Sequence, residues 1–312
     1  IASGLRPGVL PTSHDPMPLW SLCDLLDHHR EHELVDLVLL TGDLATTGDH
    51  ADLAEARRLV CLMTDPGAKA TGLAVSERSE SYRASATAAG ACLLPGNHDR
   101  YGPSIGWPPF APGGVAFDKV FHREWPVARG AHVYPPLVRQ DCPPLVIIGA
   151  DLSLPGGAMD GLWDKGAWMG RGAADASVLG ALQSVTDETR RRVPEAGIVW
   201  AVHFAPEFAK LAENLRLMKG ESVLAAAANC GVEHVFCGHT HESRQYTVGA
   251  CTVHCAGSAS SCGGGVRSFF VHGISVDRSG RVLVDSVEYA YALETGIAHF
   301  VPRQEADSQS PR

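Results

Sequence analysis

Five short, mostly apolar runs, each leading into a glycine or a polar group, are the most regular pattern along the chain. They are residues 35–40, 91–94, 145–148, 197–202 and 232–236. Runs of this length with little alternation are typical of strands that are buried on both faces of a sheet. We therefore predict five interior strands, and the polar residues that follow each run stand at the carboxyl end of a strand.

Longer stretches with helical spacing lie between the runs. They cover residues 19–33, 51–63, 178–192 and 221–229. Strands that alternate with helices predict an α/β core whose functional groups lie at the carboxyl ends of the strands. Residues 251–291 alternate in a β manner around turns such as the "DRSG" at 277–280.

These patterns predict one domain over residues 1–301 and a polar C-terminal tail at 302–312. Two long loops, at 64–90 and 100–140, interrupt the rhythm of strands and helices. Loops of that length in a compact domain are commonly lids or binding loops, or partly mobile.

Composition narrows the class of protein. With 312 residues, 45% of them hydrophobic, the chain can bury a large core. A net charge of −9 argues against a nucleic-acid or membrane-surface partner, because both need a broad basic face. No apolar run approaches the roughly 18 to 20 residues that span a bilayer, and no signal peptide is visible. We expect a cytoplasmic protein, and an N-terminal signal that has been removed stays open.

Cysteine and histidine usage points to different chemistry. Nine scattered cysteines do not predict a disulfide framework. The spacing closest to a metal site is that of Cys251, Cys255 and Cys262, which we interpret as buried or loop thiols. Fifteen histidines are the more informative excess, because imidazole is both a metal ligand and a proton carrier.

The "GHTH" segment offers one pair of candidate ligands. In an extended chain, side chains two positions apart point to the same side, so His239 and His241 face together. Two imidazoles at a strand end can bind a metal ion, although such pairs also occur on surface strands. His203 follows another strand, where a lone histidine is more often a hydrogen-bonded core residue.

The "PGNHD" segment supplies an amide, an imidazole and a carboxylate at a further strand end. His98 and Asp99 together are typical of a proton-transferring imidazole that a carboxylate orients. Asn97, directly before them, supplies the amide oxygen. The alternative is that Asn97 and Asp99 form an Asx turn. In "TGD", Asp43 is either a carboxylate between two cations or a helix-capping aspartate.

Together, the ordered motifs Gly-Asp, Gly-Asn-His-Asp, His and Gly-His-x-His resemble those of the calcineurin-like metallophosphoesterase family, from about residue 1 to about residue 290. The "IIGADLS" and "AGSAS" segments are similar to its bacterial branch related to cyclic-nucleotide phosphodiesterases. The resemblance implies a two-sheet β-sandwich flanked by helices, a four-layer αββα arrangement, with metal ligands at strand ends on one edge.

The resemblance also implies roles for individual residues. Asp43 would bridge two metal ions, one of them completed by Asn97, His203 and His239, and His241 would belong to the other. His98 would lie beside the substrate phosphate, oriented by Asp99. Nitrogen and oxygen ligands suit Mn, Fe or Zn. Two such ions about 3.5–4 Å apart would activate water and clamp the phosphoryl oxygens.

The family's first motif, Asp-x-His, is altered. In "IASGLRPG", Gly4 stands at the position of the Asp and Arg6 at that of the His. We expect one tightly bound metal ion and an empty or weakly filled second site. Arg6 would place its charge there, against Asp43 or a phosphate oxygen, or else point to solvent. The nearby His14 and Asp15 have suitable chemistry but the wrong spacing.

We therefore expect metal-dependent hydrolysis of a small phosphorylated substrate, a phosphodiester or phosphomonoester, with reduced activity. The alternatives are a non-catalytic relative that binds a phosphorylated ligand or a protein partner, and an α/β binding protein without metal. The glycine-rich stretch at 258–268 could bind an anion, but we favour a hairpin turn there. Arg171 could reach a phosphate, and we favour a structural arginine. Homo-oligomer formation stays open.

Overall fold

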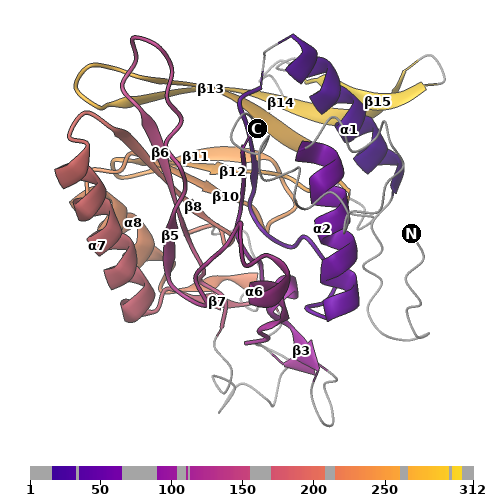
Figure 1. The fold of residues 1–312 in the computed structure, drawn as a ribbon, viewed down its shortest axis with the longest axis horizontal. Helices are drawn as coiled ribbons and strands as arrows, with labels where there is room; N and C mark the ends of the chain where they lie inside the picture. Colours follow the sequence, from indigo (N-terminus) through magenta and orange to yellow (C-terminus); the bar gives the residue numbers. More distant parts are fainter. Residues whose placement is uncertain are drawn as a thin grey trace, which may run out of the picture.

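The computed structural model describes residues 16–32, 35–64, 90–103, 110–111, 113–154, 170–207, 215–260, 266–294 and 297–303 (Figure 1). Its helices are α1 (Pro16–Glu31), α2 (His50–Thr64), the short 3-10 helix η1 (His98–Arg100), α6 (Ala116–Val120), α7 (Ala176–Arg192) and α8 (Gly220–Asn229). Among these described residues, no helix has the length and apolar character needed to cross a membrane.

The largest sheet has the strand order β11-β12-β10-β8-β6-β5. Its strands are β5 (Ala131–Val133), β6 (Leu145–Ala150), β8 (Gly197–Val202), β10 (His234–Cys237), β11 (Arg244–Val248) and β12 (Cys251–Cys255). The four inner strands run parallel, whereas β5 and β11 pair antiparallel at the two edges. The carboxyl ends of β6, β8 and β10 therefore meet at one edge of the sheet.

Two smaller sheets lie against this one. Strands β1 (Leu37–Leu40) and β2 (Gly90–Leu93) pair in parallel, and β13 (Ser268–Val276), β14 (Val282–Glu294) and β15 (Ile297–Pro302) form an antiparallel meander. The remaining strands are two-residue pieces: β3 (Gly102–Pro103), β4 (Phe110–Ala111), β7 (Gly172–Ala173) and β9 (Leu217–Met218).

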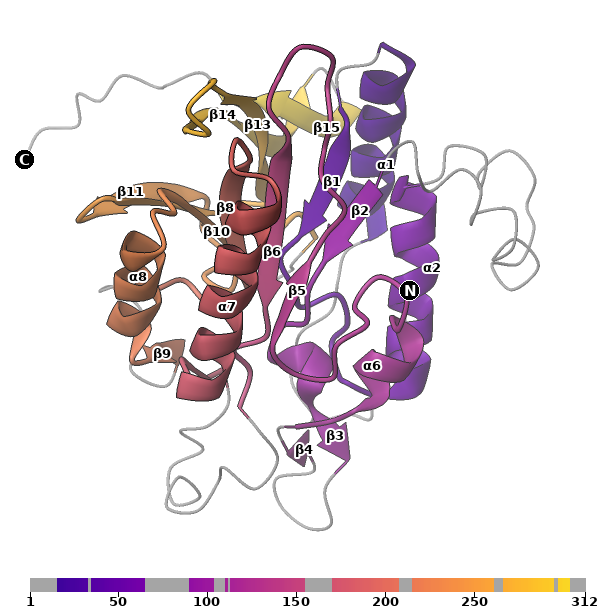
Figure 2. The same ribbon diagram turned by 60° about the vertical axis from the view of Figure 1, so that its left-hand side comes forward.

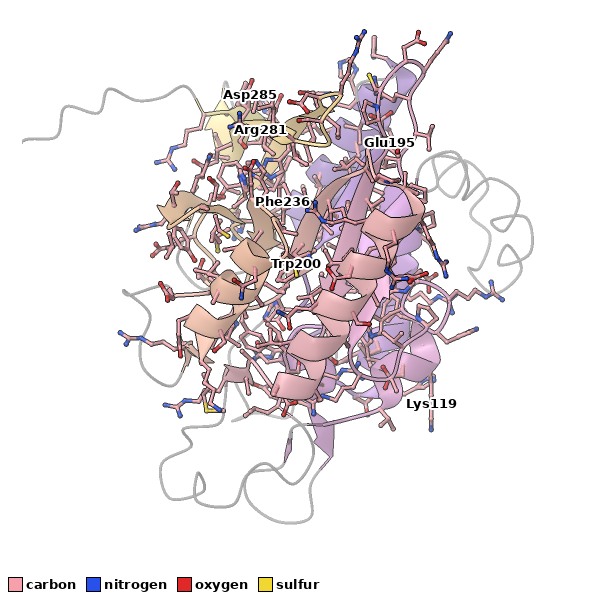
Figure 3. All side chains as sticks on the ribbon, turned by 90° about the vertical axis from the view of Figure 1, so that its left-hand side faces the viewer. Lys119, Glu195, Trp200, Phe236, Arg281 and Asp285 are labelled. Atoms are coloured by element: carbon pink, nitrogen blue, oxygen red, sulfur yellow. The ribbon has the colours of Figure 1, made fainter. Side chains whose placement is uncertain are left out.

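Figure 2 shows the order of the layers, from α7 and α8 through the large sheet and the smaller sheets to α1 and α2. Two apolar cores separate them. Trp200, on β8, packs in the core under α7 and α8, whereas Phe236, on β10, packs in the core between the sheets (Figure 3). Both side chains are buried. The layering confirms the predicted sandwich flanked by helices.

The predicted elements agree with the structure to within three residues at each end. Strand β8 has the predicted bounds, and β6 continues two residues beyond the predicted end. All six residues of each strand are buried, which explains why their apolar runs are continuous. Within 100–140, expected as a loop, the described part holds β3, β4, α6 and β5. The loop at 65–89 and the tail at 304–312 lie outside the described residues.

Candidate metal centre

The carboxyl ends of four strands meet where the candidate site lies. The segment after β1 runs beside the segment after β2, since Leu94 N donates to Leu40 O at 3.1 Å. In the large sheet, Gly238 N donates to His203 O at 2.9 Å, which joins the ends of β8 and β10. His203 Nδ1, after β8, contacts the carbonyl of Thr41, after β1, at 2.6 Å, which joins the two pairs and brings the residues that follow all four strands together.

Glycines at two strand ends allow the backbones to approach closely. Gly42 has a φ of +98°, and a Cβ atom there would lie 2.6 Å from both Gly96 N and His203 Nδ1. A Cβ on Gly96 would collide with the Asp43 carboxylate and backbone. The "TGD" and "PGN" sequences therefore need glycine because their turns pack backbone against backbone.

Three candidate ligands adopt left-handed backbone conformations that are costly for residues other than glycine. The φ angle is 55° at Asp43 and 69° at His239, and His241 has 56°. Each such residue costs of order 1–3 kcal/mol and persists only when its surroundings enforce it. Strain of this kind clusters at functional sites, which supports a function for this edge.

Three candidate ligand atoms converge around a fourth, Nε2 of His203. Asn97 Oδ1 lies at 3.0 Å, His239 Nδ1 at 3.1 Å and Asp43 Oδ2 at 3.3 Å from that nitrogen. Atoms bonded at about 2.0–2.2 Å to one ion lie roughly 3 to 3.5 Å apart when their bonds meet between a right angle and the tetrahedral angle. The observed separations fit that range.

The hydrogen bonds of the two histidines show that this group fits a cation. His203 Nδ1 contacts the carbonyl of Thr41 at 2.6 Å, and His239 Nε2 contacts the carbonyl of Leu215 at 2.8 Å. A carbonyl accepts only, so each ring donates its proton there and turns a lone pair toward the other ligands. Two nitrogen and two oxygen lone pairs that face one another need a proton or a metal ion between them.

The electrostatics of the metal-free group agree with this. Burial would raise the pKa of Asp43, but the charges of His203 and His98 hold it far below its usual value. Burial would lower the pKa of His203, but Asp43 raises it. For His239, burial and the charge of His203 lower the pKa to about 4. The pocket thus favours one positive charge beside Asp43.

His98 lies beside the ligand group without joining it. Its backbone N–H donates to Asp43 Oδ1 at 3.0 Å, and its ring Nδ1 contacts the carbonyl of Thr46 at 2.9 Å. The ring therefore donates from Nδ1, and Nε2 is the ring's second atom for hydrogen bonding. The half-buried position suits a side chain that contacts both the protein and a ligand.

The prediction that Asp99 orients the ring of His98 is wrong, because Thr46 holds that ring. The Asp99 carboxylate instead accepts backbone N–H groups from Ala45 at 2.9 Å, Gly96 at 2.9 Å and Leu44 at 3.2 Å. Burial and the neighbouring charge of Asp43 raise the pKa of Asp99 to about 6. Asp99 fastens the turn after β1 to the turn after β2, so its role is structural.

The remaining candidates are placed less closely. His241 is exposed on the same turn as His239. Among the described residues, the ligand atoms that converge belong to Asp43, Asn97, His203 and His239, and His241 is not one of them. Gly4, Arg6, His14 and Asp15 lie outside the described residues, as does Cys262. Cys251 and Cys255 are buried free thiols in β12, as predicted. Arg171 is half-buried beside β7.

Sequence reasoning missed two side chains next to the site. Tyr101 accepts a hydrogen bond from Asn97 Nδ2 at 2.8 Å. Arg100 pairs with Asp151 at 2.8 Å and Asp118 at 2.7 Å, away from the ligands. The four-residue spacing of Asn97 and Tyr101 did not signal their contact, because η1 is a 3-10 helix, in which residues three apart lie on one side.

Comparison with known proteins agrees with this geometry. A family model for the calcineurin-like phosphoesterases matches residues 14–243, and this range contains all the ligands described above. The chain belongs to the calcineurin-like phosphoesterase family. The predicted family is thereby confirmed. Among curated proteins, no relative matches.

Solved structures with a similar fold are distant. A candidate 5'-nucleotidase from Staphylococcus aureus, in complex with α-ketoglutarate, is 14% identical with a TM-score of 0.43. The match covers 98% of this chain, which spans about half of the length of the nucleotidase chain, 53%. GAP50, the anchor in the inner membrane complex of Plasmodium, is 10% identical, with a TM-score of 0.43. The match covers 93% of this chain and 86% of GAP50. The phosphopantetheinyl hydrolase of Mycobacterium tuberculosis is 15% identical, with a TM-score of 0.40. The match covers 72% of this chain and 79% of the hydrolase.

Proposed function

We propose that this protein hydrolyses a phosphoester with a divalent metal ion, Mn, Fe or Zn, held by Asp43, Asn97, His203 and His239. The observation that supports this most is the convergence of three lone-pair atoms around a fourth, His203 Nε2, with both histidines held by backbone carbonyls. The donor set contains only nitrogen and oxygen, which favours these metals over softer ones.

A bound divalent ion supplies Lewis-acid polarisation of a phosphoryl oxygen and eases deprotonation of water. The protein's own groups do the rest. Asp43, fixed by the backbone N–H of His98, keeps a negative charge beside the ion. His98 donates from Nδ1 to Thr46 O, so only its doubly protonated form carries a proton on Nε2. That imidazolium protonates the leaving alkoxide, becomes the neutral Nδ1–H imidazole, and regains its Nε2 proton from water.

The number of metal ions follows from the altered first motif. Gly4 and Arg6 replace the ligands that would join His241 at a second ion, so we propose one tight site. Arg6 carries a permanent charge that can pair with a phosphate oxygen, but it cannot lower the pKa of water as a second ion does. We propose that hydrolysis is therefore slow.

Metal titration with a hydrolysis assay tests this proposal. Metal-free protein is titrated with Mn²⁺, and turnover of bis(4-nitrophenyl) phosphate and of 4-nitrophenyl phosphate is followed. We expect one tight equivalent, and its loss in His203→Gln. The control His122→Gln changes an exposed histidine outside the site and should bind as the wild type does. Two tight equivalents in the wild type would contradict the single-ion proposal.

The double variant Gly4→Asp, Arg6→His tests the first motif directly. We expect a second Mn²⁺ equivalent and faster turnover, because the missing ligands return. Tight Mn²⁺ binding without turnover of either ester, in the wild type and in the double variant, would instead support the alternative function, a relative that binds a phosphorylated ligand or a protein partner.

A further inference from the structure

We propose that Tyr101 is a positioning residue that turns the Asn97 amide so that its oxygen faces the metal. The inference rests on the proposed function, because it assigns Asn97 to the ion. Asn97 Nδ2 donates to the Tyr101 hydroxyl oxygen at 2.8 Å, while Asn97 Oδ1 lies 3.0 Å from His203 Nε2. The two ends of one amide are thus held by different partners.

An asparagine binds a metal ion through one of its two ends only. The carboxamide oxygen has lone pairs, whereas the NH₂ group has only donors. A reversed Asn97 would direct two N–H bonds at the cation. Both Asn97 and Tyr101 are buried, so water does not readily replace the phenol as the acceptor for Nδ2. By accepting from Nδ2, the hydroxyl oxygen therefore stabilises the orientation in which Oδ1 reaches the ligand group.

The phenol is itself held in place. Gly170 N donates to the same oxygen at 2.9 Å, and Tyr101 N donates to His98 O at 3.1 Å at the end of η1. The ring of Tyr101 packs edge-on against the ring of His98, with centroids 5.0 Å apart. One tyrosine thus contacts the proposed ligand Asn97 and the proposed proton donor His98, and it joins the segment that begins at Gly170 to the site.

The chain offers a matched control. Tyr134 is also buried, and its hydroxyl donates to the carbonyl of Leu93, at the end of β2 but away from the ligand atoms. Tyr101→Phe and Tyr134→Phe each remove one buried hydroxyl group and keep the ring. A structural effect should appear in both variants, whereas an effect on metal affinity should appear only in Tyr101→Phe.

The test measures Mn²⁺ affinity of the metal-free proteins by the electron paramagnetic resonance signal of free Mn²⁺. Loss of a group that orients a metal ligand typically costs 10–100-fold in affinity. We expect that loss in Tyr101→Phe and wild-type affinity in Tyr134→Phe. Thermal melting without metal checks that both variants fold.

A second pair of variants separates orientation from any general effect on the site. Asn97→Asp presents an oxygen whichever way it turns, so adding Tyr101→Phe to Asn97→Asp should lower the affinity only slightly. The positioning role would be overturned if Tyr101→Phe lowered the Mn²⁺ affinity equally with Asn97 and with Asn97→Asp. It would also be overturned if Tyr101→Phe alone left the affinity unchanged. Wild-type protein that binds no Mn²⁺ would overturn the proposed function and this role together. Binding without hydrolysis would overturn the proposed function alone.

Discussion

Three histidines from three strands lie together between the sheets, away from the metal centre. His254 stacks on Phe236, with ring centroids 4.7 Å apart, and lies 5.3 Å from the rings of both His234 and His272. His234 Nδ1 contacts His254 Nε2 at 3.0 Å, and His272 Nδ1 contacts Ser286 Oγ at 2.8 Å. Such a cluster makes the protein sensitive to acid.

The hydrogen bonds show why protonation is unfavourable here. His234 Nε2 contacts the carbonyl of Val282 at 3.1 Å, so it donates there, and His234 Nδ1 accepts from His254 Nε2. The other nitrogen of His254, Nδ1, is buried without a hydrogen-bond partner. Burial, followed by the charges of His272 and His234, lowers the pKa of His254 to about 3. Burial also lowers the pKa of His234. There the nearby charge of Glu233 raises the pKa and that of Arg281 lowers it.

The magnitude follows from proton linkage. Folding holds His254 neutral, with a pKa of about 3, whereas in the unfolded chain it binds a proton below about pH 6.5. Its contribution to stability is therefore full above about pH 6.5 and is lost as the pH falls toward 3. At pH 5 the loss from this one residue is about 2 kcal/mol.

Urea unfolding at pH 7.5 and pH 5 measures this effect. The variant His254→Gln keeps an N–H group for His234 but does not titrate. We expect the wild type to lose about 2 kcal/mol more than the variant between the two pH values. Carboxylates affect both proteins alike, so the difference isolates His254. Equal losses in the two proteins would refute the reasoning.

Three further predictions concern the site and its support. Replacing His98 with Ala should lower turnover by about 10²–10⁴-fold and leave the Mn²⁺ content unchanged, as kinetics and metal analysis would show. Arg100→Met should lower the free energy of unfolding by about 3–5 kcal/mol, because Asp151 is left buried without its partner. As a control, Arg139→Met breaks the exposed ion pair with Asp36 and should lower it by at most about 1 kcal/mol. Gly42→Ala should abolish tight Mn²⁺ binding in the same titration, since no Cβ fits at that turn; unchanged binding would contradict the packing described.

The sequence by itself determined the order of the strands and helices and the edge on which the ligands lie. Continuous apolar runs marked β6 and β8, because both faces of these strands are buried. Since parallel strands of one sheet share their carboxyl edge, His203 and His239 could be assigned to one place, and the family resemblance added Asn97 and Asp43 to them before any contact was known.

Only the tertiary structure decided how those side chains are held. Asp99 binds backbone N–H groups rather than the His98 ring, and Thr41 and Leu215 act through their carbonyls. Every residue has a carbonyl, so no residue type signals this role in a sequence. The hydrogen bond from Asn97 to Tyr101 likewise depends on the turn of η1. Strand patterns are local and repeat along the chain, whereas hydrogen-bond partners are chosen by the packing of segments far apart in it.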